Sequence, residues 1–153
     1  MDLFVSKYVN KIDKKGRVSL PSSFRNVLPK ANRNEIILYK SIKTPSIEGC
    51  GVGRLKEIAK RINNLDFFSE DYDDFSTSIF SEIITTNIDK EGRFLIPEEL
   101  KLHASIKTEA AFFGQGHYFQ IWEPKKGLKN TEDSRRRLLK EKKSLRMMLT
   151  QQK

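Results

Sequence analysis

The chain has 153 residues, and 29 Lys or Arg against 20 Asp or Glu give it a formal net charge of +9 at pH 7. A chain of this length can bury a core without disulfides or metals, and its single cysteine excludes an internal disulfide. No stretch approaches the roughly 18 apolar residues that span a bilayer, and no signal peptide is recognisable, so we expect a cytoplasmic protein with no membrane partner.

The charges are distributed unevenly along the chain. Residues 1–30 contain seven Lys or Arg and two Asp, and residues 125–153 contain eleven Lys or Arg and three acids. Residues 66–82 contain six acids and no base. Basic ends around an acidic centre predict an anionic partner and are compatible with packing between copies. Composition alone leaves DNA, RNA and a membrane surface open as that partner.

One ten-residue pattern occurs twice. Residues 12–21 (IDKKGRVSLP) and 88–97 (IDKEGRFLIP) are identical at six positions, and each copy follows a strand-like run. Asp at the first position of the turn and Gly at the fourth favour a type I β-turn. The pattern therefore predicts two hairpin turns, with Lys14-Lys15 and Lys90-Glu91 at their exposed tips.

The residues after each turn predict a short strand and a short helix. Val18 and Leu20 fall on one face of the first returning strand, and Arg17 and Ser19 fall on the other. Each strand ends at a proline, Pro21 or Pro97, which suits the first position of a helix because its missing N–H costs nothing there.

Between the two copies, the pattern predicts a buried strand over residues 35–39 that pairs with a later strand near 51–52. Apolar residues at helical spacing predict an amphipathic helix over 54–65. A second helix is expected to start at Ser69, because two acids follow it in the first turn. Beyond the second copy, residues 110–113 and 118–122 predict a hairpin, and 131–151 predict a strongly basic helix.

The turn Asp-Lys-x-Gly-Arg, followed by apolar-x-apolar-Pro and a short helix, resembles the AbrB/SpoVT swapped-hairpin family. Two linked copies, with Gly-Gln-Gly-x-x-x-x-Ile-Trp-x-Pro at 114–124, resemble the MraZ family in particular, over roughly residues 3–125. The resemblance implies an α+β fold in which two AbrB-like swapped-hairpin repeats intertwine into one small β-barrel with flanking helices. Repeat 1 would cover 3–53, a helical linker 54–82, repeat 2 83–126, and a basic C-terminal helix or tail 127–153.

The same resemblance implies a function. It predicts a sequence-specific DNA-binding transcriptional regulator of the division and cell-wall gene cluster, which binds tandem promoter repeats in double-stranded DNA. Such a protein would be associated with the nucleoid and would form a homo-oligomeric ring of eight or twelve copies. A nucleoid- or RNA-binding protein without sequence specificity also explains the charge and stays open as the alternative.

The resemblance also implies that the Asp-x-x-x-Arg motif of each turn contacts DNA, and the exposed lysines of the turns are added as phosphate contacts. The candidate DNA-binding residues are therefore Asp13, Lys14, Lys15, Arg17, Asp89, Lys90 and Arg93. An arginine fork matches guanine or phosphate oxygens, whereas the two aspartates are expected to fix the turn or orient the arginine. The alternative for each arginine is a surface residue that merely pairs with the turn aspartate. Glu91, in place of Lys15, predicts weaker phosphate binding by the second turn.

No catalytic or metal-binding pattern is present in the sequence, so we expect no enzyme activity and no cofactor. His103 and His117 are fourteen residues apart with no Cys or second His near either, which is no metal motif. The segment 114–116 lacks the further glycines of a phosphate-binding loop.

The aromatic-rich stretch 67–80 is predicted to lie in a core or in a subunit interface. As an interface, its acids would meet bases such as Lys56, Lys60 and Arg61 of a neighbouring copy.

Overall fold

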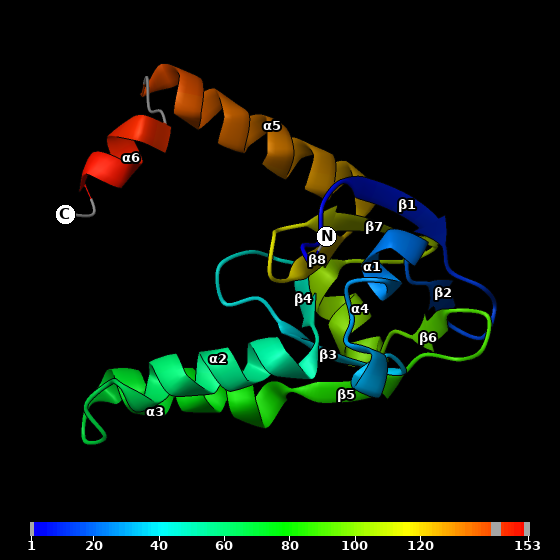
Figure 1. Ribbon diagram of the computed structural model, residues 1–153. Coiled ribbons are helices and arrows are strands. Elements are labelled where there is room, and N and C mark those ends of the chain that lie inside the picture. Colours follow the sequence, from blue (N-terminus) through cyan, green and yellow to red (C-terminus); the bar gives the residue numbers. More distant parts are fainter. Residues whose placement is uncertain (1, 142–144, 152–153) are drawn as a thin grey trace.

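The computed structural model describes residues 2–141 and 145–151 (Figure 1). Its strands are β1 (Lys7–Lys11), β2 (Arg17–Ser19), β3 (Glu35–Lys40), β4 (Ile47–Cys50), β5 (Ile84–Asn87), β6 (Arg93–Leu95), β7 (Glu109–Gly114) and β8 (Phe119–Trp122). Its helices are α1 (Ser22–Arg25), α2 (Val52–Asn63), α3 (Glu70–Ile79), α4 (Glu98–Ala104), α5 (Pro124–Lys140) and α6 (Leu145–Gln151), with 3₁₀ turns at Lys30–Asn32 and Phe80–Glu82. The fold is mixed α+β, as predicted.

Every strand of the first half of the chain pairs with a strand of the second half. One antiparallel sheet has the order β1-β7-β8-β4-β3-β5, and a second sheet contains β2 and β6. The first four strands pair with the last four in the reciprocal combinations β1–β7, β2–β6, β3–β5 and β4–β8. Neither half can therefore complete its hydrogen bonding without the other.

The predicted single closed barrel is not formed by the hydrogen bonds of the described strands. The larger sheet is open, with β1 and β5 at its edges, and the β2–β6 pair lies next to these two edge strands. Side chains take the place of ladder hydrogen bonds at this junction. Asn10 Nδ2 donates to the Ser19 carbonyl (2.8 Å), and Thr86 Oγ1 donates to the Leu95 carbonyl (3.4 Å). The short strands β2 and β6 are then followed by prolines, which have no N–H to continue a ladder.

Two predicted boundaries were wrong. The partner strand of β3 is β4 at Ile47–Cys50, and Gly51 instead precedes α2 as its N-cap. Gly49 lies within this strand, and the position requires glycine because the Phe119 ring of β8 occupies the space that a Cβ atom would need. The basic helix begins at Pro124 and ends at Lys140, seven residues before its predicted start and with α6 as a separate element. The intervening residues 142–144 of the predicted helix lie outside the described residues.

The helix after each proline of the repeat begins one residue later than predicted. Pro21 and Pro97 are the N-cap residues of α1 and α4, with extended backbone, and do not occupy the first helical position.

An aromatic cluster at the centre of the molecule holds the two sheets and α1 together. Phe24 of α1 is fully buried, and its ring lies 5.3 Å from those of Phe4 and Phe119. Tyr8 packs edge-on at 5.6 Å, and Phe112 completes the cluster at 6.3 Å. Val18 and Leu20 also enter this core, as their alternation with exposed Ser19 predicts.

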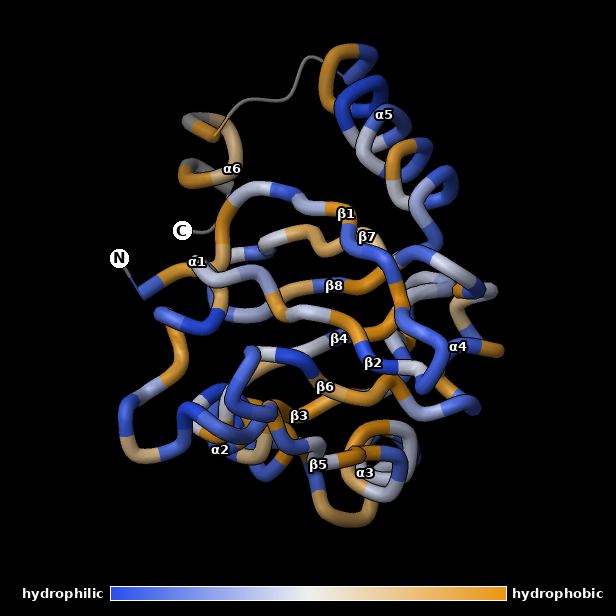
Figure 2. The backbone as a smooth tube through the Cα atoms, turned by 90° about the vertical axis from the view of Figure 1, so that its right-hand side faces the viewer, coloured by the Kyte–Doolittle hydropathy of each residue, from blue (hydrophilic) through white to orange (hydrophobic). Residues whose placement is uncertain are grey.

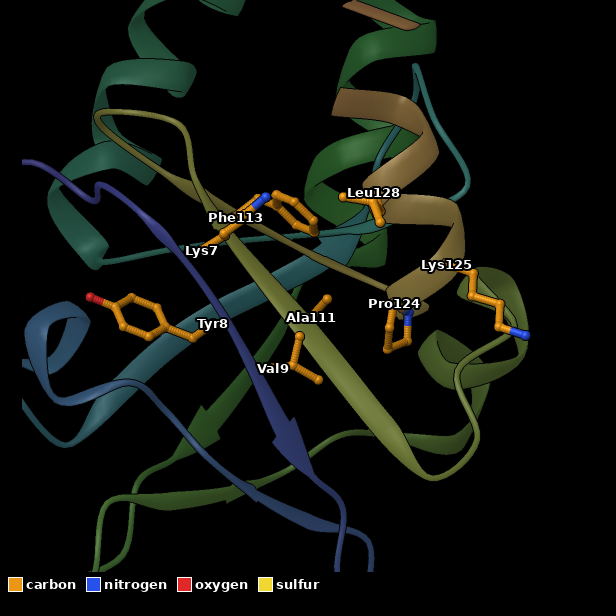
Figure 3. A pocket seen from close by; sticks show the side chains of 8 residues that line it. All are labelled: Lys7, Tyr8, Val9, Ala111, Phe113, Pro124, Lys125 and Leu128. Atoms are coloured by element: carbon orange, nitrogen blue, oxygen red, sulfur yellow. The ribbon is translucent and has the colours of Figure 1, made fainter. Parts of the chain in front are cut away.

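Two helical arms extend from the sheet on the side opposite to β2 and β6 (Figure 1). One arm is the α2–α3 hairpin. The other is α5, whose first turns pack on β7 and β8 at Gly127, where Phe113 and Trp122 leave no room for a Cβ atom. Side chains of β1, β7 and α5 line a groove of about 400 Å³ at the base of this arm (Figure 3).

The aromatic stretch 67–80 does not fill the core of a single chain. The Phe67 and Phe68 side chains are 65% and 89% exposed, and Phe75 and Phe80 are also exposed. These rings therefore lie on the surface of the α2–α3 arm.

We expect Phe24→Ala to lower the free energy of unfolding by about 3–5 kcal/mol, because it empties a fully buried aromatic site. Leu102→Ala is the matched control, since Leu102 is 72% exposed on α4, and should change the stability by less than about 0.5 kcal/mol. Urea unfolding followed by circular dichroism measures both. Similar midpoints for the two variants would contradict this assignment of the core.

Candidate nucleic-acid interface

The first turn is organised by the carboxylate of Asp13. Gly16 N–H donates to the Asp13 carbonyl at 3.0 Å, which closes the predicted turn, and Gly16 has a positive φ of 85°. One carboxylate oxygen, Oδ1, accepts from the backbone N–H groups of Lys15 and Arg17 at 2.9 and 2.8 Å. The other, Oδ2, accepts from Arg17 Nε at 2.8 Å. Asp13 therefore fixes both the backbone of the turn and the position of its arginine.

The second turn repeats these contacts. Gly92 N–H donates to the Asp89 carbonyl at 3.0 Å, and Gly92 has a φ of 81°. Asp89 Oδ1 accepts from the N–H groups of Glu91 and Arg93 at 3.0 and 2.9 Å, and its Oδ2 accepts from Arg93 Nε at 3.2 Å. Two segments that are far apart in the sequence thus adopt one local structure, as the repeated pattern predicts.

The β2–β6 pair places the two turns at opposite ends of one ribbon. Arg17 is opposite Leu95, and Ser19 is opposite Arg93. Since paired residues share a face, these four side chains point to one side of the ribbon. The intervening pair, Val18 and Phe94, points into the core and is buried. Figure 2 shows the molecule from the side that carries this ribbon.

Exposed lysines flank the ribbon at each tip. Lys14 and Lys15 are exposed in the first turn, and Lys90 is exposed in the second. All seven candidate residues are thereby brought to the two ends of one short ribbon.

The two arginines differ in what remains of their hydrogen-bonding capacity. Each pairs through Nε with its own turn aspartate, which is the contact that the alternative interpretation predicted. Within the described residues, the terminal nitrogens of Arg17 have no hydrogen-bond partner. In Arg93, Nη2 lies 3.5 Å from the carboxylate of Glu91. The fork of Arg17 is therefore oriented and available, whereas that of Arg93 is partly neutralised.

Each turn also receives a basic side chain from the other half, which sequence analysis missed. Arg25 of α1 donates through Nη1 to the Glu91 carbonyl at 3.3 Å and lies against Gly92. Lys101 of α4 occupies the corresponding place beside Gly16. The signal was present, because both residues are bases four positions after the proline of their repeat. What the sequence did not indicate was that each reaches the opposite turn.

Hydrogen bonds lower the pKa of both turn aspartates. The largest cause for Asp13 is the hydrogen bond from the Arg17 backbone N–H. Desolvation opposes this effect, and the bonds from the Arg17 side chain and the Lys15 N–H lower the pKa further. The pKa of Asp89 is lowered in the same way, chiefly by the Arg93 backbone N–H. Both carboxylates are thus ionised at neutral pH and available as acceptors.

Residues 2–141 and 145–151 also bear on two other kinds of site, a metal centre and a membrane span. No group of three or more His, Cys, Asp or Glu in this part of the chain can hold a metal ion. His103 contacts the Ser46 carbonyl through Nε2 at 3.1 Å. None of the helices described here is long and apolar enough to cross a membrane.

Sequence comparison finds known proteins that are similar to most of this chain. A family model described as "MraZ protein, putative antitoxin-like" matches residues 79–143. Proteins named transcriptional regulator MraZ from Rickettsia rickettsii, Rickettsia felis and Rickettsia typhi are each 44% identical over 124 residues, which cover 81% of this chain and 83% of the relative.

The fold and the site define an α+β protein in which two equivalent basic turns flank a two-stranded ribbon. The extent and identity of the sequence matches show that the chain belongs to the MraZ family.

We expect the carboxyl groups of Asp13 and Asp89 to titrate below the ordinary value of 3.8 in the folded protein. A lowered folded-state pKa stabilises the fold above the unfolded-state pKa, and this contribution is lost as the pH falls through the folded-state pKa. Carboxyl ¹³C NMR measures both values. In Arg17→Ala the pKa of Asp13 should stay lowered in part, because the backbone N–H is the largest cause. Ordinary values for both groups in the wild-type protein would show that the turns are not held by these bonds.

Proposed function

We propose that the protein is a sequence-specific DNA-binding transcriptional regulator that contacts DNA with the β2–β6 ribbon and its two turns. The observation that carries this proposal is the placement of Arg17 and Arg93 on the outer face of one ribbon, each oriented by an aspartate. The major groove of B-DNA admits a two-stranded β-ribbon, and an arginine fork matches the N7 and O6 acceptors of guanine. The names of the relatives support the regulatory part of the proposal.

The other basic groups suit contacts with the DNA backbone. Lys14, Lys15 and Lys90 at the tips are well placed to contact phosphates on either side of a groove that holds the ribbon. Arg25 and Lys101 add positive charge beside the turns. Asp13 and Asp89 act as positioning residues, because a carboxylate repels phosphate and their oxygens already accept bonds from the turn.

The reciprocal strand pairing supports a more specific description of the fold. We propose that the chain is a tandem pair of AbrB-like swapped-hairpin repeats within residues 3–53 and 83–126, linked by residues 54–82 and followed by the basic segment 127–153. In this description, the β2–β6 pair is the crossing point of the two hairpins.

We further propose that the protein acts as a homo-oligomer, in ring form, on tandem promoter repeats of the division and cell-wall gene cluster, in the cytoplasm at the nucleoid. A single ribbon offers few charges, whereas several ribbons in one assembly would bind several repeats at once. The exposed apolar side chains of the α2–α3 arm support self-association, because large exposed apolar patches normally mark interfaces.

Arg17→Ala should weaken binding to the promoter region of the protein's own gene cluster about ten-fold or more, since loss of a bidentate base contact costs roughly 1–3 kcal/mol. Arg93→Ala should cost less, because Glu91 already occupies part of its fork. Fluorescence anisotropy with specific and scrambled duplexes measures both.

Lys43→Ala is the control for this comparison, since Lys43 is exposed in the turn after β3, at the end of that strand remote from the second turn. Unchanged affinity in Arg17→Ala would remove the ribbon as the site. Equal affinity of the wild-type protein for specific and scrambled duplexes would favour the alternative of a nonspecific nucleoid- or RNA-binding protein.

The affinity should rise from one promoter repeat to three and should fall steeply with salt. Each neutralised phosphate contributes about −0.9 to the slope of log affinity against log salt concentration. Titrations at several salt concentrations on duplexes with one, two and three repeats test this. A slope near zero, or equal affinity for one and three repeats, is incompatible with multivalent binding.

A further inference from the structure

The α2–α3 arm has an apolar groove along its surface. The groove has a volume of about 270 Å³, and the residues that line it are Ile58, Arg61, Ile62, Leu65, Phe75 and Ile79. Five of these six side chains are apolar, and Phe75 is 37% exposed. Apolar surface of this kind is stabilised when a partner covers it.

The border of this groove is acidic. The helix α3 contains four acids and no base over Glu70–Ile79. Asp71 and Asp74 are three residues apart, so they lie on the same side of α3, next to the Phe75 side chain. Arg61 is the one base among the lining residues, so the acids outnumber it. A segment with both apolar and basic side chains therefore complements this surface in hydrophobicity and charge.

The second arm, α5, has this chemistry. Residues 124–140 contain seven bases and two acids, and most of the helix is hydrophilic (Figure 2). Near its end, Leu138 and Leu139 are 51% and 68% exposed. Leu139 lies three helical turns after Leu128, so the leucines form an apolar stripe on one side of the helix. Arg135 lies within this stripe and Arg136 borders it.

The distal half of α5 has little support from its own chain. Among the residues that the structure describes, the side-chain hydrogen bonds and ion pairs of residues 131–140 all lie within α5, such as those from Lys129 and Arg136 to Asp133. A helix without tertiary packing is only marginally stable in water. This half of α5 therefore gains most from a partner that covers its leucines.

We propose that the distal half of α5 in one copy packs into the α2–α3 groove of a second copy. Leu138 and Leu139 enter the groove, and Arg135 and Arg136 meet Asp71 and Asp74. The contact rests on the proposed homo-oligomer and names the two surfaces that build it. Since these surfaces differ, the contact is head-to-tail, and every copy carries both.

The arrangement of the arms favours a second copy as the occupant. In one chain, α5 starts over β7 and β8, whereas the α2–α3 arm lies beyond β3 and β5 at the other edge of the sheet (Figure 1). Both arms point away from the ribbon, so α5 does not extend along the face that carries Arg17 and Arg93. DNA is therefore the less suitable partner for its distal half.

Charge reversal on full-length protein tests the contact. The variants are Asp71→Lys/Asp74→Lys, Arg135→Glu/Arg136→Glu, and all four changes combined. Light scattering after size-exclusion chromatography at micromolar concentration should show each double variant shifted toward the 17.8 kDa monomer and the combined variant restored to the wild-type mass. The variant Lys56→Glu/Lys60→Glu reverses two exposed bases on the opposite side of α2 from the groove and should leave the mass unchanged. A shift of this variant toward the monomer would overturn the proposed contact in favour of the one predicted from the sequence, in which these bases meet the acids of a neighbouring copy.

A second measurement does not depend on charge. Leu139→Cys protein and Phe75→Cys protein, differing in tag length, are mixed and treated with a short bismaleimide. We expect a cross-linked heterodimer, whereas Cys50 is buried and should not react in folded protein. Circular dichroism confirms that each variant is folded.

The possible results separate this contact from the functional proposal. An oligomer that persists in both double variants, with no heterodimer in the cross-linking, overturns the contact and leaves self-association standing. A monomeric wild-type protein overturns both, while binding to one DNA repeat still tests the ribbon. If Arg135→Glu/Arg136→Glu keeps its mass but loses affinity for a single repeat, α5 binds nucleic acid and the proposed contact is wrong.

Discussion

The antiparallel pairing of β2 with β6 is the interaction on which the other features of the molecule depend. Leu20 N–H donates to the Gly92 carbonyl at 2.9 Å, and Ile96 N–H donates to the Gly16 carbonyl at 3.3 Å, so each turn is attached to the strand of the other repeat. Val18 and Phe94 anchor the inner face of the pair in the core. Strands of three residues are therefore enough to fix the positions of the two turns. Their few ladder hydrogen bonds would not be stable alone, and the burial of Val18 and Phe94 supplies the additional stabilisation.

This shared scaffold carries two turns that are alike in structure and unlike in charge. The aspartate, glycine and arginine of each turn make the same set of bonds, whereas Lys15 of the first turn corresponds to Glu91 of the second. Because Glu91 lies at the tip, the exchange leaves the backbone unaffected and changes only the electrostatics of the neighbouring arginine. The first turn thus has two lysines at its tip, whereas the arginine of the second turn is partly neutralised.

Much of the local structure was predictable from the sequence because it depends on neighbouring residues. Asp13 and Gly16 are close enough in sequence to specify their turn by hydrogen bonding and a positive φ alone. The alternation after each turn predicted which residues enter the core, and helical spacing predicted α2 to within two residues. The strand at Ile47–Cys50 was predicted too far along the chain, and it contains Gly49, a residue type that weakens a strand when only its neighbours in sequence are considered. The position requires glycine because of the Phe119 ring, which lies 70 residues further along the chain.

The sequence by itself therefore determined the two turns, their charges and the faces of the strands that follow them. Only the tertiary structure decided that the sheet stays open, that Arg25 and Lys101 each reach the turn of the other repeat, and that the α2–α3 arm and α5 extend away from the ribbon. Local bonds are set by side chains within a few residues of one another. Strand closure, cross-repeat contacts and the directions of helices depend instead on how surfaces from distant parts of the chain pack, and no single segment carries that information.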